Sequence, residues 1–207
     1  MLDLKNPTIV LANGEFPKHH SALDILNFGY NIICTDGSAD KLKEHGIPPK
    51  IIIGDFDSAK IIHKKSEALW IERPDQNKTD LEKAFEFCLE EKINEIVVLG
   101  ATGQEDDHNL ANILIAYQYS KKLNIELISN YFRIMFINER KTIKAKKNMR
   151  VSMISLDTNN KISSSGLQYE LKNETLDTFT KGISNKCMEN EFTISAEKEL
   201  ILFTEIV

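Results

Sequence analysis

The chain has 207 residues, with 42% hydrophobic and 28% charged side chains and a formal net charge of −5, a composition typical of a globular protein with one large or two small domains. The negative charge argues against a nucleic-acid partner, and no apolar run approaches the ~20 residues that span a membrane. The N-terminus lacks a signal-peptide pattern, and Cys34, Cys88 and Cys187 lie far apart without zinc-site spacing, so we predict a soluble, cytoplasmic protein.

Short apolar runs alternate with helical patterns over the first 131 residues. Short apolar runs predict strands at 8–12, 31–35, 51–53, 68–71, 96–99 and 125–128, and Gly54 would let the chain turn out of the third strand. Helices are predicted between them, at 22–28, 38–46, 79–89 and 107–122. Because strands and helices that alternate at this spacing form parallel βαβ units, we expect residues 1–131 to form a Rossmann-like α/β domain.

Capping patterns and periodicity predict details of these helices. Ser38 is the candidate N-cap of the second helix, and Thr79 with Glu82 matches a capping box at the start of the third. Apolar residues at helical spacing predict the buried face of the fourth helix, which would include Leu110, Ile113, Leu114 and Tyr117.

The sequence changes character after residue 131. Short β-rich segments, at 133–138, 151–156, 192–195 and 200–204, are separated by clusters of Ser, Asn, Gly and Lys. The basic run at 141–150 alternates with apolar residues, which indicates the solvent face of a strand or turn. We expect residues 132–207 to form a small antiparallel sandwich or barrel.

Acidic and other polar residues follow the predicted strands. Asp55 and Asp57 stand at i and i+2 after the third strand, so in extended backbone both carboxylates would face one side while Phe56 anchors on the other. Such a pair needs a cation or a proton, although Asp and Gly are also common in solvated turns. Ligands of parallel α/β sheets bind at the carboxyl ends of strands. The convergence of acids there favours a divalent-metal site that faces a polyphosphate.

Asp80 and the turn Gly100-Ala101-Thr102-Gly103 extend this candidate site. Asp80 lies one turn before Ala84 of the buried stripe, which suits a metal ligand, although an acid there also favours the helix dipole. The turn precedes a helix and resembles a phosphate-binding turn, but no Gly-Lys-Ser/Thr follows, so it is not a Walker A loop. His108, beside Asp107, is either a substrate contact or a residue bonded to local backbone.

Taken in order, these motifs resemble those of the thiamine pyrophosphokinase family. The matching segments are Asp36–Ser38, Gly54–Ser58, Asp75–Asp80 and Gly100–Gly103, the last followed by Asp107, His108 and Asn112. Gly166–Tyr169 with Leu171, and Gly182–Asn185, resemble the family's C-terminal signatures, so the resemblance covers nearly the whole chain. It implies an N-terminal α/β domain over 1–131, a thiamine-binding β-sandwich over 132–207, and a homodimer with sites at the subunit interface. It also implies transfer of a pyrophosphoryl group from ATP to the hydroxyl of thiamine, which gives thiamine diphosphate and AMP.

The resemblance also implies roles for individual residues. Asp55, Asp57 and Asp80 would hold Mg²⁺ and, with Asp107, act in catalysis. The nucleotide site would consist of Asp36, Gly37, Asp75, Gln76, Thr79, Gly100, Thr102, Gly103 and His108. Ser184 and Asn185 would contact thiamine, from the partner subunit.

One position departs from the family pattern. The family usually has an Arg two positions before the Asp of its Gly-rich motif, and here that position is Glu105. Loss of a cation beside the phosphates should weaken charge stabilisation in the transition state. Lys78, Lys83 and Arg73 are candidate replacements. Two other functions stay open at this point: a pyrophosphokinase for another heterocyclic alcohol, such as a pterin, and a nucleotide- or thiamine-binding protein with little turnover.

Overall fold

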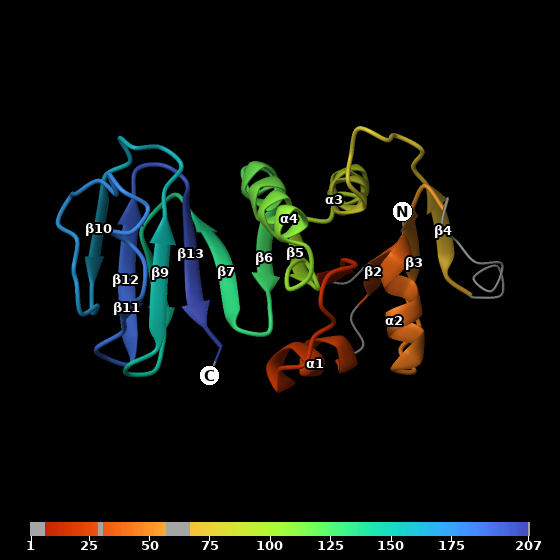
Figure 1. Cartoon of the computed structure of the whole chain (residues 1–207), viewed down its shortest axis with the longest axis horizontal. Coiled ribbons are helices and arrows are strands. Elements are labelled where there is room, and N and C mark those ends of the chain that lie inside the picture. The colour runs from red at the N-terminus through yellow and green to blue at the C-terminus, as the bar shows by residue number, and fades with distance from the viewer. Residues whose placement is uncertain (1–6, 29–30, 57–66, 207) are drawn as a thin grey trace. The chain divides into compact units, whose positions relative to one another are not determined.

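The structure, a computed structural model, describes residues 7–28, 31–56 and 67–206. Asp57 and Ser58 of the acidic motif lie outside the described residues. The chain divides into two compact units, Met1–Asn130 and Tyr131–Val207, called unit 1 and unit 2 below. Figure 1 labels their elements. Within the described ranges, no helix is both long and apolar enough to cross a membrane.

Unit 1 contains a parallel sheet. Its strands are β1 (Thr8–Leu11), β2 (Ile32–Thr35), β3 (Ile51–Gly54), β4 (Leu69–Glu72), β5 (Glu95–Leu99) and β6 (Asn124–Ile128). The helical segments are α1 (His20–Asn27), the short 3-10 helix η1 (Asp36–Ser38), α2 (Ala39–Glu44), α3 (Asp80–Glu90) and α4 (Asp106–Tyr119). These elements match the alternation predicted from the sequence, within a few residues at each end.

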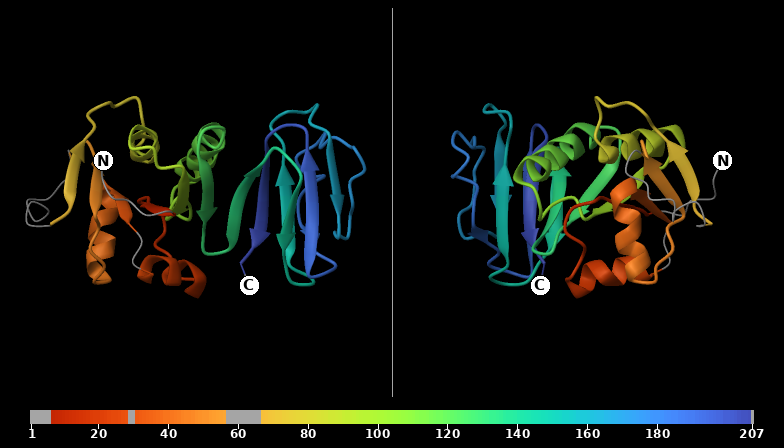
Figure 2. Two further views of the ribbon diagram at one scale, coloured as in Figure 1. Left: turned by 180° about the vertical axis from the view of Figure 1, so that it is seen from behind. Right: turned by 45° about the vertical axis from the view of Figure 1, so that its right-hand side comes forward.

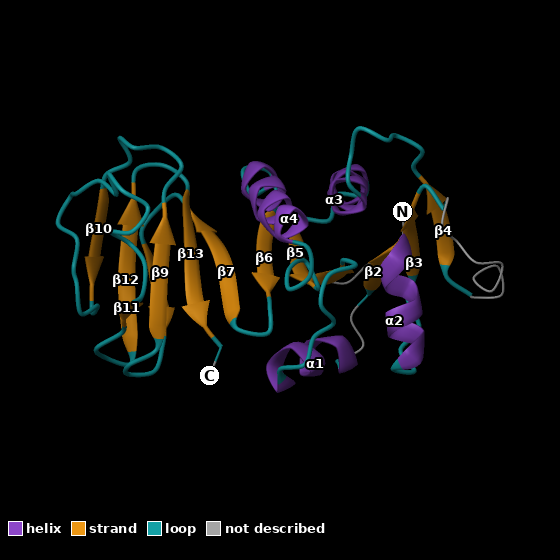
Figure 3. Cartoon of the chain, in the orientation of Figure 1, coloured by secondary structure: helices purple, strands orange, loops and turns teal. Residues whose placement is uncertain are grey.

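The strand order across this sheet is β6-β5-β1-β2-β3-β4, and each neighbouring pair is parallel. The chain moves one way across the sheet from β1 to β4 and then returns past β1 to β5. Because such crossovers are right-handed, α1 and α2 cover one face and α3 and α4 the other (Figures 2 and 3). The loops after β1 and β5 therefore meet where the strand order reverses, which is where open α/β sheets bind ligands. The predicted parallel α/β fold is confirmed.

Helix α3 forms for the reasons that its sequence indicates. Its apolar stripe is buried, and the Thr79 hydroxyl accepts the N–H of Glu82 at 3.3 Å as an N-cap. The side chain of Glu82 accepts the hydroxyl of Tyr119 in α4 at 3.2 Å. That bond links α3 to α4, and the rings of Phe85 in α3 and Tyr119 in α4 also lie 5.5 Å apart.

Two local predictions, for Leu110 and Phe56, are wrong, and the one for Ser38 is correct in position only. Ser38 occupies the N-cap position of α2, but its hydroxyl lies 2.7 Å from the Leu11 carbonyl and caps no helix N–H. Leu110 is 61% exposed, so the buried face of α4 does not extend to its first turns. Phe56 has a φ of 59°, so the backbone after Asp55 is not extended, although the ring does pack 5.0 Å from Trp70.

Unit 2 is an antiparallel β-sandwich. One sheet has the order β11 (Asn185–Lys186), β9 (Arg150–Ile154), β13 (Leu200–Glu205), β7 (Phe132–Ile137). The other has the order β10 (Ile162–Ser165), β12 (Glu191–Ala196), β8 (Lys141–Lys144). Inward residues of both sheets, such as Val151, Met153, Ile162, Phe192 and Leu202, form one apolar core. The predicted antiparallel sandwich is confirmed, and the basic run at 141–150 lies on β8 and the following turn, where every lysine is exposed.

Candidate active site

A cavity of about 320 Å³ opens in unit 1 at the carboxyl ends of the parallel strands. Its walls come from the loop after β1, the ends of β2 and β3, the start of α3, and the turn and first helical residues after β5. Of the predicted site residues, the cavity wall includes Asp55, Thr79, Asp80 and His108. The sheet thus brings together side chains that lie up to 53 positions apart in the chain, as the position of the strand ends predicts.

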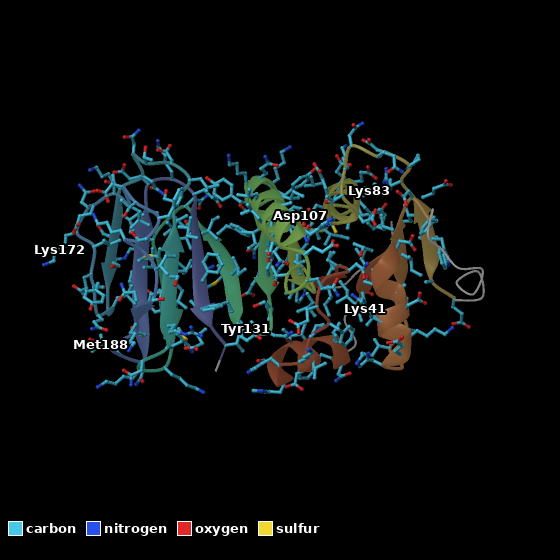
Figure 4. The ribbon with its side chains drawn as sticks, in the orientation of Figure 1. Lys41, Lys83, Asp107, Tyr131, Lys172 and Met188 are labelled. Carbon is cyan, nitrogen blue, oxygen red and sulfur yellow. The ribbon has the colours of Figure 1, made fainter. Side chains whose placement is uncertain are left out.

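Lys83, which is labelled in Figure 4, contacts both described acids of the predicted metal site. Its Nζ atom is 3.0 Å from Oδ1 of Asp80, one helical turn earlier in α3, and 3.6 Å from Oδ2 of Asp55 at the end of β3. The lysine side chain is only 3% exposed, whereas those of Asp80 and Asp55 are 34% and 24% exposed. A buried ammonium group needs such partners. The two carboxylates therefore share one cation and remain accessible from the cavity.

The segment before α3 closes over Asp55. Gln76 donates its amide Nε2 to Oδ2 of Asp55 at 2.9 Å. Asp75 accepts the backbone N–H of Asn77 at 2.9 Å, and this bond is the main reason that its pKa lies below the usual range. Lys78 lines the cavity, but its ammonium group pairs with Glu86 at 2.5 Å. Asp75 and Gln76 thus shape and support the site, with Gln76 in direct contact with a carboxylate of the cavity wall.

The loop after β1 and the turn after β5 are joined by backbone hydrogen bonds. Gly14 donates its N–H to the Gly100 carbonyl at 2.6 Å, and Glu15 donates to Thr102 at 2.9 Å. A Cβ atom at Gly14 would lie 2.4 Å from the Gly100 oxygen, so only glycine permits this approach. The third carbonyl of the turn, that of Ala101, accepts the amide of buried Asn112 at 2.7 Å.

These bonds give the turn a polarity that suits an anion. The carbonyl oxygens of Gly100, Ala101 and Thr102, which would repel a phosphate, all bond to donors within the protein. In a trans peptide the next N–H points the opposite way from the carbonyl. The N–H groups that follow these three carbonyls therefore point away from the carbonyls' donors. One of them, the N–H of Gly103, donates to the Asn109 side chain at 2.9 Å. Asn109 was not predicted from the sequence, because its bond to Gly103 is a tertiary contact.

Asp36 and Gly37 lie beneath the cavity and do not form its wall. Asp36 is 7% exposed, and a Cβ atom added at Gly54 would lie 2.6 Å from the Cβ atom of Asp36. Gly37 packs in the same way against the Asn13 side chain, which does line the cavity. Both residues therefore hold neighbouring strand ends close together.

The start of α4 carries an exposed group of three candidate ligands. Oxygen or nitrogen atoms of Glu105, Asp107 and His108 lie within 4.8 Å of one another, with His108 Nε2 3.6 Å from a Glu105 carboxylate oxygen. Asp107, labelled in Figure 4, accepts the N–H of His108 at 2.8 Å and is not part of the cavity wall. Glu105, the position that departs from the family pattern, does line the cavity.

In unit 2, one of the two predicted thiamine contacts bonds to the backbone of an exposed tyrosine. Ser184 is exposed and has a φ of 59°, a left-handed conformation that few non-glycine residues adopt. Asn185 is 5% exposed, and its amide accepts the N–H of Tyr169 at 3.1 Å and donates to the Tyr169 carbonyl at 2.7 Å. The Tyr169 side chain is 67% exposed. Asn185 therefore fixes the backbone that presents this ring.

Comparisons with known proteins match the whole architecture. Residues 25–128 match the catalytic domain of thiamin pyrophosphokinase, and residues 140–201 match its vitamin B1 binding domain. The "Thiamine pyrophosphokinase" of Bacillus subtilis is 31% identical over 181 residues, which are 82% of this chain and 84% of that protein. "Thiamin pyrophosphokinase 1" of Caenorhabditis elegans is 29% identical over 84% of this chain and 78% of its own length.

Solved structures agree with these sequence matches. A crystal structure of thiamine pyrophosphokinase from Bacillus subtilis superimposes with a TM-score of 0.81 at 27% identity, covering 96% of this chain and 98% of that one. The relationship thus extends over both units and does not rest on one motif. The chain belongs to the thiamin pyrophosphokinase family.

Proposed function

We propose that this chain is a thiamine pyrophosphokinase, an enzyme that transfers the pyrophosphoryl group of ATP to the hydroxyl of thiamine and yields thiamine diphosphate and AMP. The observation that carries this proposal is the convergence of Asp55, Asp80 and Lys83 in a cavity at the carboxyl ends of the sheet, in a chain of this family. In the reaction, the hydroxyl oxygen bonds to the β-phosphorus and releases its proton, the bond from that phosphorus to the α–β bridging oxygen breaks, and AMP departs. The comparisons do not favour the alternative of a pterin substrate.

Asp55 and Asp80 suit a magnesium ion, with Asp57 as a third proposed ligand from outside the described residues. Both carboxylates line the cavity, are partly exposed, and approach one buried cation. Carboxylate oxygens are the ligands that Mg²⁺ prefers, and the ion usually bridges protein carboxylates and substrate phosphates. When bound, Mg²⁺ would neutralise the charge of the phosphates during transfer.

The remaining catalytic work falls to positioning and charge. The turn Gly100–Gly103, whose carbonyls already bond within the protein, is the proposed binding site of the ATP phosphates. Of this turn, Ala101 lines the cavity, as do Thr79 and His108, whereas Gly100, Thr102 and Gly103 do not. Asp36, Gly37, Asp75 and Gln76 act by supporting this wall, and Asp107 acts at its edge.

Among the three cations that could replace the family's arginine, Lys83 is the best placed. Arg73 forms an ion pair with Glu90, and Lys78 forms one with Glu86. Of the three, Lys83 alone is both buried and directed at the acids of the cavity. Its position supports the proposal that catalysis persists in the presence of Glu105.

Thiamine would bind through unit 2, and the protein would act as a cytoplasmic homodimer. Exposed Ser184 offers a hydroxyl, and exposed Tyr169, whose backbone is held by Asn185, offers an aromatic face; both suit a cationic heteroaromatic ring. Unit 1 would bind ATP and Mg²⁺, so that the predicted domains at 1–131 and 132–207 would divide the two substrates between them. The partner copy would supply Ser184 and Asn185 to each site.

The proposal is tested by incubating the purified protein with ATP, MgCl₂ and thiamine and measuring AMP and thiamine diphosphate. We expect Asp80→Asn to lower the rate by at least ~100-fold, the order of loss seen when charge stabilisation of a transition state is removed. Asp24→Asn, at an exposed position of α1, is the control and should retain activity. AMP release with a pterin alcohol but not with thiamine would contradict the substrate assignment. Full activity of Asp80→Asn would contradict the proposed role of Asp80 in the active site.

A further inference from the structure

Lys41 of α2 has an unusual set of partners for a lysine (Figure 4). Its Nζ atom donates to the backbone carbonyls of Asn13 at 2.8 Å and Gly14 at 2.7 Å. Burial lowers the pKa of its ammonium group. The neighbouring Lys43, by contrast, is exposed at the end of the same helix. Lys41 therefore directs its charge at two peptide groups of the loop after β1.

These two peptide groups are the ones that bond to the turn after β5. The carbonyl of Asn13 belongs to the same peptide as the N–H of Gly14, and the carbonyl of Gly14 to the same peptide as the N–H of Glu15. Those N–H groups donate to Gly100 and Thr102. Because the N–H and C=O of a trans peptide point in opposite directions, Lys41 and the turn lie on opposite sides of the loop.

A charged donor at one end of a series of linked hydrogen bonds strengthens the hydrogen bonds at the other end. The ammonium group polarises each carbonyl that it contacts, which makes the N–H of the same peptide a stronger donor. The carbonyls of Gly100 and Thr102 are thereby held away from the cavity, where they would repel phosphate oxygens. Asn13 and Gly14 also line the cavity, so a shift of the loop would change its wall directly.

We propose that Lys41 is a positioning residue for the nucleotide phosphates: it acts through the loop at Asn13–Glu15 to fix the turn at Gly100–Gly103. The inference rests on the proposed function, which makes this turn the seat of the ATP phosphates. Lys41 itself does not line the cavity and touches neither substrate. Its loss should weaken nucleotide binding more than thiamine binding.

The test compares Lys41→Met with Lys43→Met as the matched control. In Lys41→Met, we expect the KM for ATP to rise about tenfold, since hydrogen bonds from charged groups contribute free energies of that order. The KM for thiamine should stay within about twofold and kcat within about threefold of wild type, because Lys41 acts on the loop and turn of unit 1 and not on the proposed thiamine contacts of unit 2. Lys43→Met should match the wild type. Equal changes in both KM values, or no change, would refute the role.

Chemical rescue provides a variant that separates positioning from general damage. In Lys41→Cys, alkylation with 2-bromoethylamine creates a lysine-like side chain and should restore the KM for ATP. The native cysteines are all buried, and burial raises the pKa of Cys34 and Cys88 to about 12, so the introduced thiol should react selectively. Failure of the alkylated, folded protein to recover nucleotide affinity would overturn the proposal.

A binding measurement distinguishes this inference from the proposed function. Calorimetric titration with α,β-methylene-ATP, which cannot undergo the transfer, should give a Kd about tenfold higher for Lys41→Met than for wild type, from the same loss of charged hydrogen bonds. If the wild type forms no AMP but shows this difference, the proposed reaction fails and the role of Lys41 stands. If the wild type is active and the Kd values are equal, the role of Lys41 fails.

Discussion

Replacing Lys83 by methionine should destabilise unit 1 by about 2 kcal/mol. Removal of one partner from a buried ion pair costs ~3–5 kcal/mol, because the other charge remains without compensation. Here the carboxylates of Asp80 and Asp55 are 34% and 24% exposed, so water screens part of that repulsion and roughly halves the cost. For a chain of 207 residues, this loss corresponds to a decrease in Tm of about 6 °C.

A magnesium ion should reverse much of this loss, because it would supply the missing positive charge between the two acids. Differential scanning calorimetry with and without saturating MgCl₂ is the assay. We expect Mg²⁺ to raise the Tm of Lys83→Met by more than it raises that of the wild type. In the double variant Lys83→Met/Asp80→Asn, the acids no longer repel, so the double variant should be more stable than Lys83→Met alone. Lys122→Met, at an exposed position after α4, is the control and should leave the Tm unchanged.

Two results would refute this reasoning. A Tm of Lys83→Met within about 1 °C of the wild type would mean that the lysine does not compensate the acids, since the expected loss is several times larger. A magnesium-induced increase no greater than that of the wild type would mean that Asp55 and Asp80 do not hold the ion. Neither readout depends on enzymatic turnover.

The remaining predictions concern subunit assembly and pH. Mixing inactive Asp80→Asn subunits with inactive Ser184→Arg subunits should restore part of the AMP formation if each site combines two copies; an absence of recovery would contradict the shared site. Glu205 accepts hydrogen bonds from the Arg150 guanidinium at 2.9 Å, and these bonds are the main reason that its pKa lies below the usual 4.5. A depressed carboxyl pKa stabilises the fold above the unfolded-state value, and this stability is lost as the pH falls through the folded-state value. Glu205→Gln should therefore lower the free energy of unfolding by about 1 kcal/mol at pH 7, and in urea titrations the difference should close below pH 4.5; a constant difference would contradict the ion pair.

The alternation of strands and helices could be predicted because its determinants are local. Runs such as Ile51–Ile53 favour a strand, and the stripe behind Thr79 favours a helix, whatever surrounds them. Each strand end then identified a loop at the carboxyl edge of the sheet. Asp55 and Asp80 were placed in one cavity by this topology alone, since parallel strands meet there.

The parts that could not be predicted depend on contacts between distant segments. The sequence shows that Lys83 lies three residues after Asp80, but not that its ammonium group is buried and reaches Asp55. Likewise, the sequence predicts a turn at Gly14, and only the structure reveals the close approach of this residue to the Gly100 carbonyl. Leu110 was predicted to be buried and is exposed, because periodicity predicts an apolar helix face but not whether another element covers it.

The charges of the cavity favour the proposed magnesium ion at this site. Its wall carries the carboxylates of Asp55, Asp80 and Glu105 against the ammonium groups of Lys78 and Lys83. Lys78 already pairs with Glu86 outside the wall, so the acids exceed the available cations. Such a cavity repels the polyphosphate of free ATP. The position of Glu105 increases this repulsion where the family usually has an arginine. We therefore propose that a magnesium ion held by these acids would neutralise the charge of the wall. It would have to supply more of the positive charge at the phosphates than it would beside an arginine.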